Sequence, residues 1–102
     1  MKITISLQAL QWFKEEMGVK KGDNVKFYTQ FYGSSPVQQS YSLGFSKEDP
    51  INIIASTELE GILFFVEETD LWYFDGHDLS VEYNEQADEL EFNYVKPWTL
   101  VI

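Results

Sequence analysis

The N-terminal part of the chain shows a strand pattern followed by a helix pattern. Residues 3–5 alternate apolar and polar side chains, which predicts a short strand. Apolar residues then recur at helical spacing with lysine and glutamate on the other side, and Ser6 stands where an N-cap belongs. Gly18 is placed to end this helix in a left-handed conformation. We expect the apolar stripe to pack in the core; its members are Ala9, Leu10, Phe13 and Met17.

The middle of the chain has the period of two that is typical of strands. Residues 24–32 alternate between two faces and predict a half-buried strand, which residues 33–36 interrupt. Residues 39–45 resume the extended pattern, and we expect the two strands to pair. Residues 51–55 and 62–67 are apolar, β-branched and aromatic, so they predict inner strands joined at residues 59–61.

The last third contains two apolar stretches around a turn signal. Residues 71–74 and 79–83 flank Asp75-Gly76, and this pattern alone is typical of a β-hairpin. An acidic turn at residues 84–89 precedes a final strand at residues 90–95. With the earlier elements, this predicts a β-rich α+β protein of about seven or eight short strands with one N-terminal helix.

Length and charge limit the classes of protein to which the chain can belong. At 102 residues we expect a single domain over residues 1–102, and 44% hydrophobic content is enough for a core. Seventeen acidic residues against seven basic ones give a net charge of −10. This charge argues against nucleic acid and anionic membranes, because both attract clustered lysine and arginine. Such a charge attracts cations or basic protein surfaces, although many domains are acidic without having such a partner.

The chain contains no cysteine, which excludes disulfides, thiolate metal ligands and a cysteine nucleophile. The N-terminus has no long apolar segment of the kind found in a signal peptide. No apolar run approaches the roughly 20 residues that a membrane helix needs. From these features we expect a cytoplasmic protein.

Two segments resemble a known family. Residues 32–45 read Tyr-Gly-Ser-Ser-Pro-Val-Gln-Gln-Ser-Tyr-Ser-Leu-Gly-Phe, and residues 70–83 read Asp-Leu-Trp-Tyr-Phe-Asp-Gly-His-Asp-Leu-Ser-Val-Glu-Tyr. Together they resemble the HesB/IscA family of A-type iron–sulfur carriers, which use a Gly-Cys-Ser-Gly turn and a late Cys-Gly-Cys as ligands. Ser34 stands where the first cysteine belongs, Pro36 replaces a glycine, and the end of the chain has no Cys-Gly-Cys.

The resemblance implies both a fold and a lost site. It implies a HesB-like β-sandwich or flattened barrel, with a short helical turn near residues 70–74 in place of the hairpin and Gly76 at a positive φ. It makes Gly33, Ser34 and Ser35 a vestigial cluster position, although serine is also a common turn residue. A homodimer is a further implication. An iron–sulfur cluster is not expected without thiolates.

Other candidate chemistry lies near residue 75. Asp75, His77 and Asp78 fall within four positions, a donor set that suits Fe(II) or Mn(II), although an ordinary solvated acidic turn is the simpler explanation. Ser34 and Ser35 have no histidine near them in sequence, and His77 is the only candidate base, so no nucleophile–base pair is visible and we do not expect an enzyme.

Aromatic residues suggest a partner surface. Trp72, Tyr73 and Trp98 are candidate partner-binding residues, because tryptophan and tyrosine are favoured at interfaces; the alternative is that they complete the core. The sequence therefore predicts a non-catalytic HesB-like domain without a cofactor. We expect it to bind an unknown protein or small ligand in iron–sulfur or iron metabolism. The alternatives are an Fe(II) donor that uses carboxylates and His77, and an iron–sulfur carrier.

Overall fold

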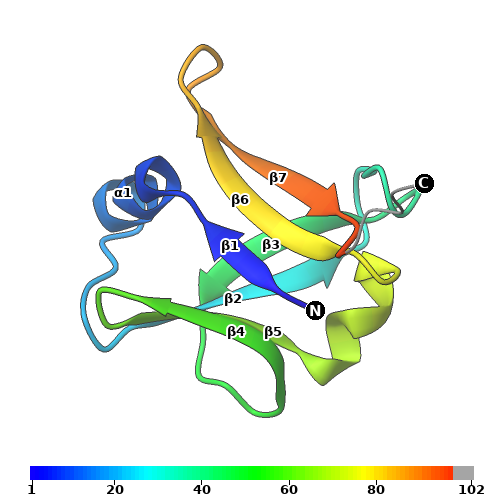
Figure 1. The fold of residues 1–102 in the computed structure, drawn as a ribbon, viewed down its shortest axis with the longest axis horizontal. Coiled ribbons are helices and arrows are strands. Elements are labelled where there is room, and N and C mark those ends of the chain that lie inside the picture. Colours follow the sequence, from blue (N-terminus) through cyan, green and yellow to red (C-terminus); the bar gives the residue numbers. More distant parts are fainter. Residues whose placement is uncertain (98–102) are drawn as a thin grey trace, which may run out of the picture.

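The fold is known from a computed structural model, which describes residues 1–97. Within these residues the chain forms seven strands and two helices, one α-helical and one 3-10 (Figure 1). In chain order the elements are β1 (Ile3–Ile5), α1 (Leu7–Glu16), β2 (Asn24–Gln30), β3 (Ser42–Lys47), β4 (Ile53–Leu59), β5 (Ile62–Glu67), η1 (Glu68–Phe74), β6 (Asp78–Asn84) and β7 (Glu89–Val95).

The strands form two mixed sheets. One sheet has the order β1-β6-β7, and the other has the order β3-β2-β5-β4. Two pairings are parallel and join distant parts of the chain: β1 with β6, where Ile3 lies opposite Leu79, and β2 with β5, where Asn24 lies opposite Leu63. The remaining pairings are antiparallel. The two sheets of residues 1–97 do not close into a barrel. The β-rich α+β prediction is thus confirmed.

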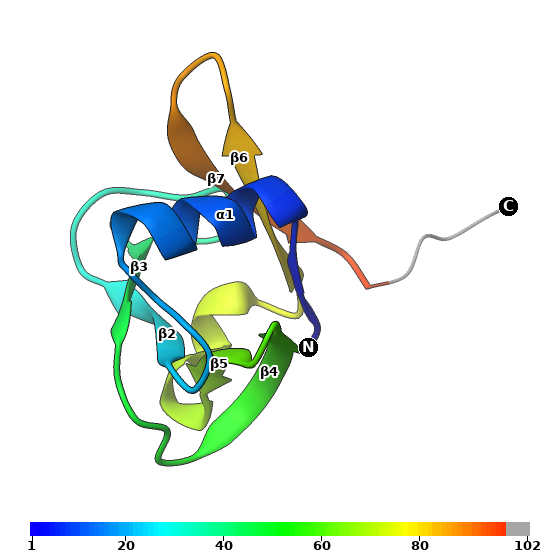
Figure 2. The same ribbon diagram turned by 90° about the vertical axis from the view of Figure 1, so that its left-hand side faces the viewer.

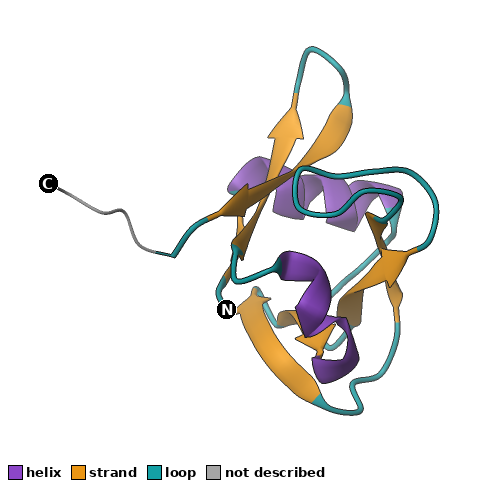
Figure 3. Cartoon of the chain, turned by 90° about the vertical axis from the view of Figure 1, so that its right-hand side faces the viewer, coloured by secondary structure: helices purple, strands orange, loops and turns teal. Residues whose placement is uncertain are grey.

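The two helices lie at opposite ends of the space between the sheets (Figures 2 and 3). Phe13 of α1 is fully buried and meets the rings of Phe27, Phe45 and Phe64 at 5.1–6.1 Å between centroids. At the other end, Tyr73 and Phe74 of η1 are also fully buried. The core is therefore largely aromatic, and burial of these rings is the main source of its stability.

Helix α1 follows its sequence signals. The Ser6 hydroxyl accepts from the Ala9 amide at 3.1 Å, and Gly18 has φ +65°, so both helix-end predictions are confirmed. Buried Ala9, Leu10 and Phe13 form the predicted stripe.

The segment around residue 75 is a helix followed by a turn, which confirms the expected helical turn near residues 70–74 and the positive φ of Gly76. The hairpin suggested by the pattern alone is wrong. Asp75 and Gly76 have φ values of +47° and +77°, and the chain passes from η1 into β6 through them. Aspartate is one of the few non-glycine residues that tolerate this region. The same dipeptide serves both kinds of turn, which is why the pattern alone misleads. None of the helices within residues 1–97 combines the length and apolar character needed to span a bilayer.

Candidate functional site

Four aromatic side chains form a continuous exposed group at the η1 end of the molecule. We name the residues Phe31, Tyr32, Tyr41 and Trp72 the aromatic surface. Phe31 is 66% exposed, Tyr32 80% and Trp72 51%, while Tyr41 is half-buried between them. Ring centroids are 5.7 Å apart for Phe31–Tyr32, 5.7 Å for Phe31–Tyr41 and 5.2 Å for Tyr41–Trp72, all edge to face. Exposed rings in contact with one another are unusual on a surface that has no partner.

The loop between β2 and β3 holds three of these rings. Gly33 has φ +90°, so the chain can turn directly after Tyr32. The Ser35 amide donates to the Gln38 carbonyl at 3.0 Å, and the Gln38 amide donates back to the Ser35 hydroxyl at 3.2 Å. The Ser42 hydroxyl donates to the Tyr32 carbonyl across the base of the loop. These bonds give the loop a defined shape.

The fourth ring stands on η1, which two contacts fix to the core. The buried Tyr73 hydroxyl lies 2.7 Å from that of Tyr94 on β7. Burial raises the pKa of Tyr94 well above its ordinary value, and the Tyr73 hydrogen bond raises it further. The Asp70 carboxylate accepts from the Thr29 amide of β2 at 3.3 Å. Trp72 is therefore presented by a rigid support, which lowers the entropy lost on binding.

The composition around the aromatic surface is that of a binding loop. Residues 27–46 contain no charged side chain, and residues 31–41 consist mainly of aromatic, serine, glycine and glutamine residues. Antibody binding loops use a similar mixture, because rigid aromatic rings supply contact area and small polar groups supply adaptable hydrogen bonds. The arrangement suits recognition of another protein.

The partner-binding residues predicted from the sequence differ in their exposure to solvent. Trp72 is half exposed and belongs to the aromatic surface. Tyr73 is fully buried, so its prediction as a partner contact is wrong: its ring packs on Phe74 at 5.1 Å and its hydroxyl is bonded inside the protein. Trp98 lies outside the described residues. The sequence analysis missed Phe31 and Tyr32, although their position beside a Gly-Ser-Ser-Pro turn was an available signal.

Gly33, Ser34 and Ser35, predicted as a vestigial cluster position, lie in the loop that carries the aromatic surface. Ser35 has a structural role in that loop, through its bonds with Gln38. Ser34 is exposed on its outer side. The three residues are accounted for by turn geometry.

The side chains of the three predicted metal-ligand residues are either exposed to solvent or close to backbone groups within hydrogen-bond distance. His77 Nδ1 lies 2.9 Å from the Phe74 carbonyl and 3.0 Å from the Asp75 carbonyl. Asp78 Oδ1 accepts from the Lys2 amide at 2.8 Å, and Asp75 is exposed. Among residues 1–97, no three histidine or carboxylate side chains gather closely enough to hold a metal ion. Metal binding here remains a prediction without structural support.

A second feature missed from the sequence is an acidic cleft between α1 and the β6–β7 turn. Its volume is about 240 Å³, and carboxylates and two aromatic side chains line it: Trp12, Glu15, Glu16, Tyr83, Glu85 and Asp88, with Gln8 and Gln11. The Tyr83 hydroxyl donates to the Asp88 carboxylate, and this bond raises the pKa of Tyr83 to about 12.

Fold and surface together define a small α+β protein that exposes an aromatic group suited to protein contacts. The chain belongs to the family of a Bacillus subtilis protein named pyruvate dehydrogenase inhibitor, with 49% identity over 94 residues that cover 92% of this chain and 99% of the relative. An uncharacterized protein of Staphylococcus saprophyticus is 34% identical over 90% of this chain and 97% of the relative. Another uncharacterized protein, from Staphylococcus haemolyticus, is 30% identical over 94% of this chain and 100% of the relative. No protein-family model matches the chain.

These relatives overturn the HesB/IscA resemblance. The 49% identical relative is named for the inhibition of an enzyme, and the comparisons give no support to the iron–sulfur family. The HesB-like domain function, with its iron–sulfur and iron alternatives, is therefore wrong, and the expected homodimer loses its basis. The physical reason is that Phe-Asp-Gly and Gly-Ser-Ser are short turn signatures set by positive φ at Asp75, Gly76 and Gly33. Such signatures report backbone geometry and not ancestry.

Proposed function

We propose that this protein binds pyruvate dehydrogenase and inhibits it without catalysing a reaction of its own. The observation that carries the proposal is the 49% identity with the Bacillus subtilis relative of that name, across 99% of the relative's length. Similarity over nearly the whole of both chains supports a shared mode of action, whereas a shared fold alone would not.

The aromatic surface supports an inhibitor that works by contact. Tyrosine and tryptophan dominate the residues that carry binding energy at protein interfaces. The loop of residues 31–41 holds its shape through internal hydrogen bonds, so little conformational freedom is lost when it meets a partner. The net charge of −10 and the absence of cysteine fit the rest of the proposal, which places the protein in the cytoplasm without a cofactor, a nucleic acid or a membrane partner.

The test is a steady-state assay of purified Bacillus subtilis pyruvate dehydrogenase complex, in which pyruvate-dependent NADH formation is followed as this protein is added. We expect a saturable loss of activity that recovers when the complex is diluted or the inhibitor is washed away. An unrelated acidic protein of similar size serves as the control for charge alone. Full activity at saturating inhibitor contradicts the proposal. Inhibition that persists after complete removal contradicts its non-catalytic part, because it indicates a modified enzyme.

A further inference from the structure

We propose that the aromatic surface is the inhibitory docking surface, and that it receives a segment of the target that presents lysine or arginine side chains. This inference rests on the proposed function, because it names the part of the molecule that acts and the chemistry of its partner. Three observations carry it: the charge distribution of the chain, the acidic residues of the helix that carries Trp72, and the hydrogen bonds that hold the rings' supports.

The charge distribution is strongly one-sided. Residues 48–95 contain no lysine or arginine, yet they hold all but three of the 17 acidic residues. Three lysines from the remainder of the chain are already paired, Lys14 with Glu60 at 2.7 Å, Lys26 with Glu48 at 3.7 Å and Lys47 with Asp23 at 3.6 Å. The half of the sequence that carries η1 therefore presents uncompensated negative charge, which attracts basic groups and repels a second acidic copy of the chain.

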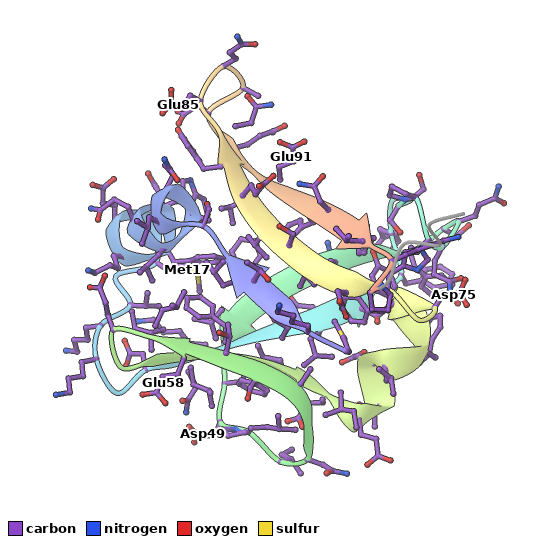
Figure 4. All side chains as sticks on the ribbon, viewed as in Figure 1. Met17, Asp49, Glu58, Asp75, Glu85 and Glu91 are labelled. Atoms are coloured by element: carbon purple, nitrogen blue, oxygen red, sulfur yellow. The ribbon has the colours of Figure 1, made fainter. Side chains whose placement is uncertain are left out.

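The helix that carries Trp72 also carries acidic residues. Asp75 caps η1 at its C-terminal end, and its amide donates to the Trp72 carbonyl at 3.2 Å. Glu68 begins the same helix, where its carboxylate accepts from the Asn52 side chain, and both acidic residues are exposed. Figure 4 places Asp75 at the end of the molecule that holds η1, far from Glu85 at the tip of the β6–β7 turn. Residues 27–46, which supply the other rings, contribute no charge of either sign.

Exposed rings next to an acidic helix are matched to the chemistry of basic side chains. A lysine ammonium or an arginine guanidinium gains cation–π attraction over a tryptophan or tyrosine face, and its charge can pair with a neighbouring carboxylate. The apolar stem of the same side chain covers the rest of the ring. The surface therefore offers a basic segment both kinds of contact.

The experiment measures inhibition and binding of purified Bacillus subtilis pyruvate dehydrogenase complex by matched variants. Trp72→Ala and Tyr32→Ala remove exposed rings, and Leu7→Ala removes a 76% exposed apolar side chain on α1 at the other end of the molecule. We expect each ring variant to weaken inhibition by about tenfold or more, and Leu7→Ala to stay within about twofold of the original protein. Among the aromatic rings of residues 1–97, Tyr32 contacts only the exposed Phe31, so this variant reports on binding even if Trp72→Ala disturbs η1.

A second pair of variants tests the charge of the partner. The double variant Glu68→Gln with Asp75→Asn removes one negative charge at each end of the helix that carries Trp72, and Glu85→Gln with Glu91→Gln removes two on the β6–β7 hairpin. We expect the first to slow association with the complex by about threefold and to reduce its dependence on NaCl between about 50 and 300 mM. We expect the Glu85/Glu91 variant to leave both the association rate and its dependence on NaCl close to those of the original protein.

The outcomes separate the two proposals. Weaker inhibition by the ring variants, together with slower and less salt-dependent association of the Glu68/Asp75 variant and unchanged controls, supports the inference. If all variants inhibit as the original protein does, the docking surface is elsewhere and the inference is overturned, while the proposed function stands. If the original protein itself neither binds nor inhibits, the proposed function fails and the inference fails with it. A dimer in light scattering that Trp72→Ala converts to monomer also overturns it, because the rings would then cover a second copy.

Discussion

Glu67 is the buried charged residue among residues 1–97, and its replacement should cost a measurable part of the protein's stability. The side chain is 5% exposed at the end of β5. One carboxylate oxygen accepts from the Ile51 amide at 2.8 Å, and the other accepts from the Asn52 amide at 2.6 Å. The Glu68 amide donates to the Asn52 carbonyl at 2.9 Å, which adds a third hydrogen bond between the same two segments. Both oxygens of Glu67 therefore hold the loop that precedes β4.

The magnitude follows from the two bonds. A hydrogen bond to a charged group contributes about 1.5–3 kcal/mol, and an amide left without a partner in a buried place adds a penalty. In Glu67→Gln the side-chain carbonyl oxygen can still accept from one of the two backbone amides. The side-chain NH2 group faces the other amide, and two donors cannot bond each other. We therefore expect a loss of about 2–3 kcal/mol in the free energy of unfolding. Glu67→Ala removes both acceptors, and we expect about 3–4 kcal/mol.

Urea unfolding followed by tryptophan fluorescence measures these changes. The midpoint should fall while the slope of the free energy against urea stays constant, because the surface exposed on unfolding is almost unchanged. Glu58→Gln is the matched control, since Glu58 is exposed on β4, and it should stay within about 0.5 kcal/mol of the original protein. A loss below about 0.5 kcal/mol for Glu67→Ala would refute the reasoning. It would mean that the two hydrogen bonds of Glu67 are no more favourable than the bonds that the same groups make to water in the unfolded chain.

Three further predictions concern the core, the first helix and high pH. Phe13→Ala removes a fully buried ring and should lower the free energy of unfolding by about 3–5 kcal/mol in the same urea assay; a loss under about 1 kcal/mol would contradict the packing described. Ser6→Ala removes the acceptor of the Ala9 amide and should cost about 1 kcal/mol, while Ser6→Asp should restore most of it. Folding raises the pKa of Tyr83 from 10.0 to about 12, mainly through Asp88, and burial raises the pKa of Tyr94 in the same direction. The stability from these phenols is complete below pH 10 and is lost as the pH rises through about 12, so urea midpoints should fall in that window and fall less in Tyr83→Phe.

The local elements were largely predictable from the sequence, because their signals are local. Ser6, the apolar stripe of α1 and Gly18 each act within one or two turns of helix, and all three predictions are confirmed. The pairing of residues 24–32 with the next strand is also confirmed, although that strand is Ser42–Lys47 and begins three residues later than predicted. The delay arises because residues 31–41 form a hydrogen-bonded loop, which alternation of side chains does not reveal.

The candidate site was less predictable, since it depends on contacts between distant segments. Tyr73 and Trp72 are neighbours in sequence, yet one is fully buried and the other half exposed. Only the position of η1 against β7 decides which ring faces inward. Glu67 appeared to be one of many acidic residues, and its burial depends on the course of residues 51–52. The aromatic surface joins residues 31–32 to residue 72, a proximity that no periodicity encodes.

The parallel pairing of β1 with β6 has a consequence for synthesis on the ribosome. Ile3 pairs with Leu79, and the neighbouring Lys2 amide bonds Asp78 across 76 positions of sequence. During synthesis β1 thus lacks the strand with which it pairs until residues 78–84 have also left the ribosome. A nascent chain interrupted before that point exposes the apolar side of α1 and β1, which makes it a substrate for chaperones and proteases. We therefore expect an arrested chain ending before residue 78 to be degraded rapidly by a protease that spares the finished protein.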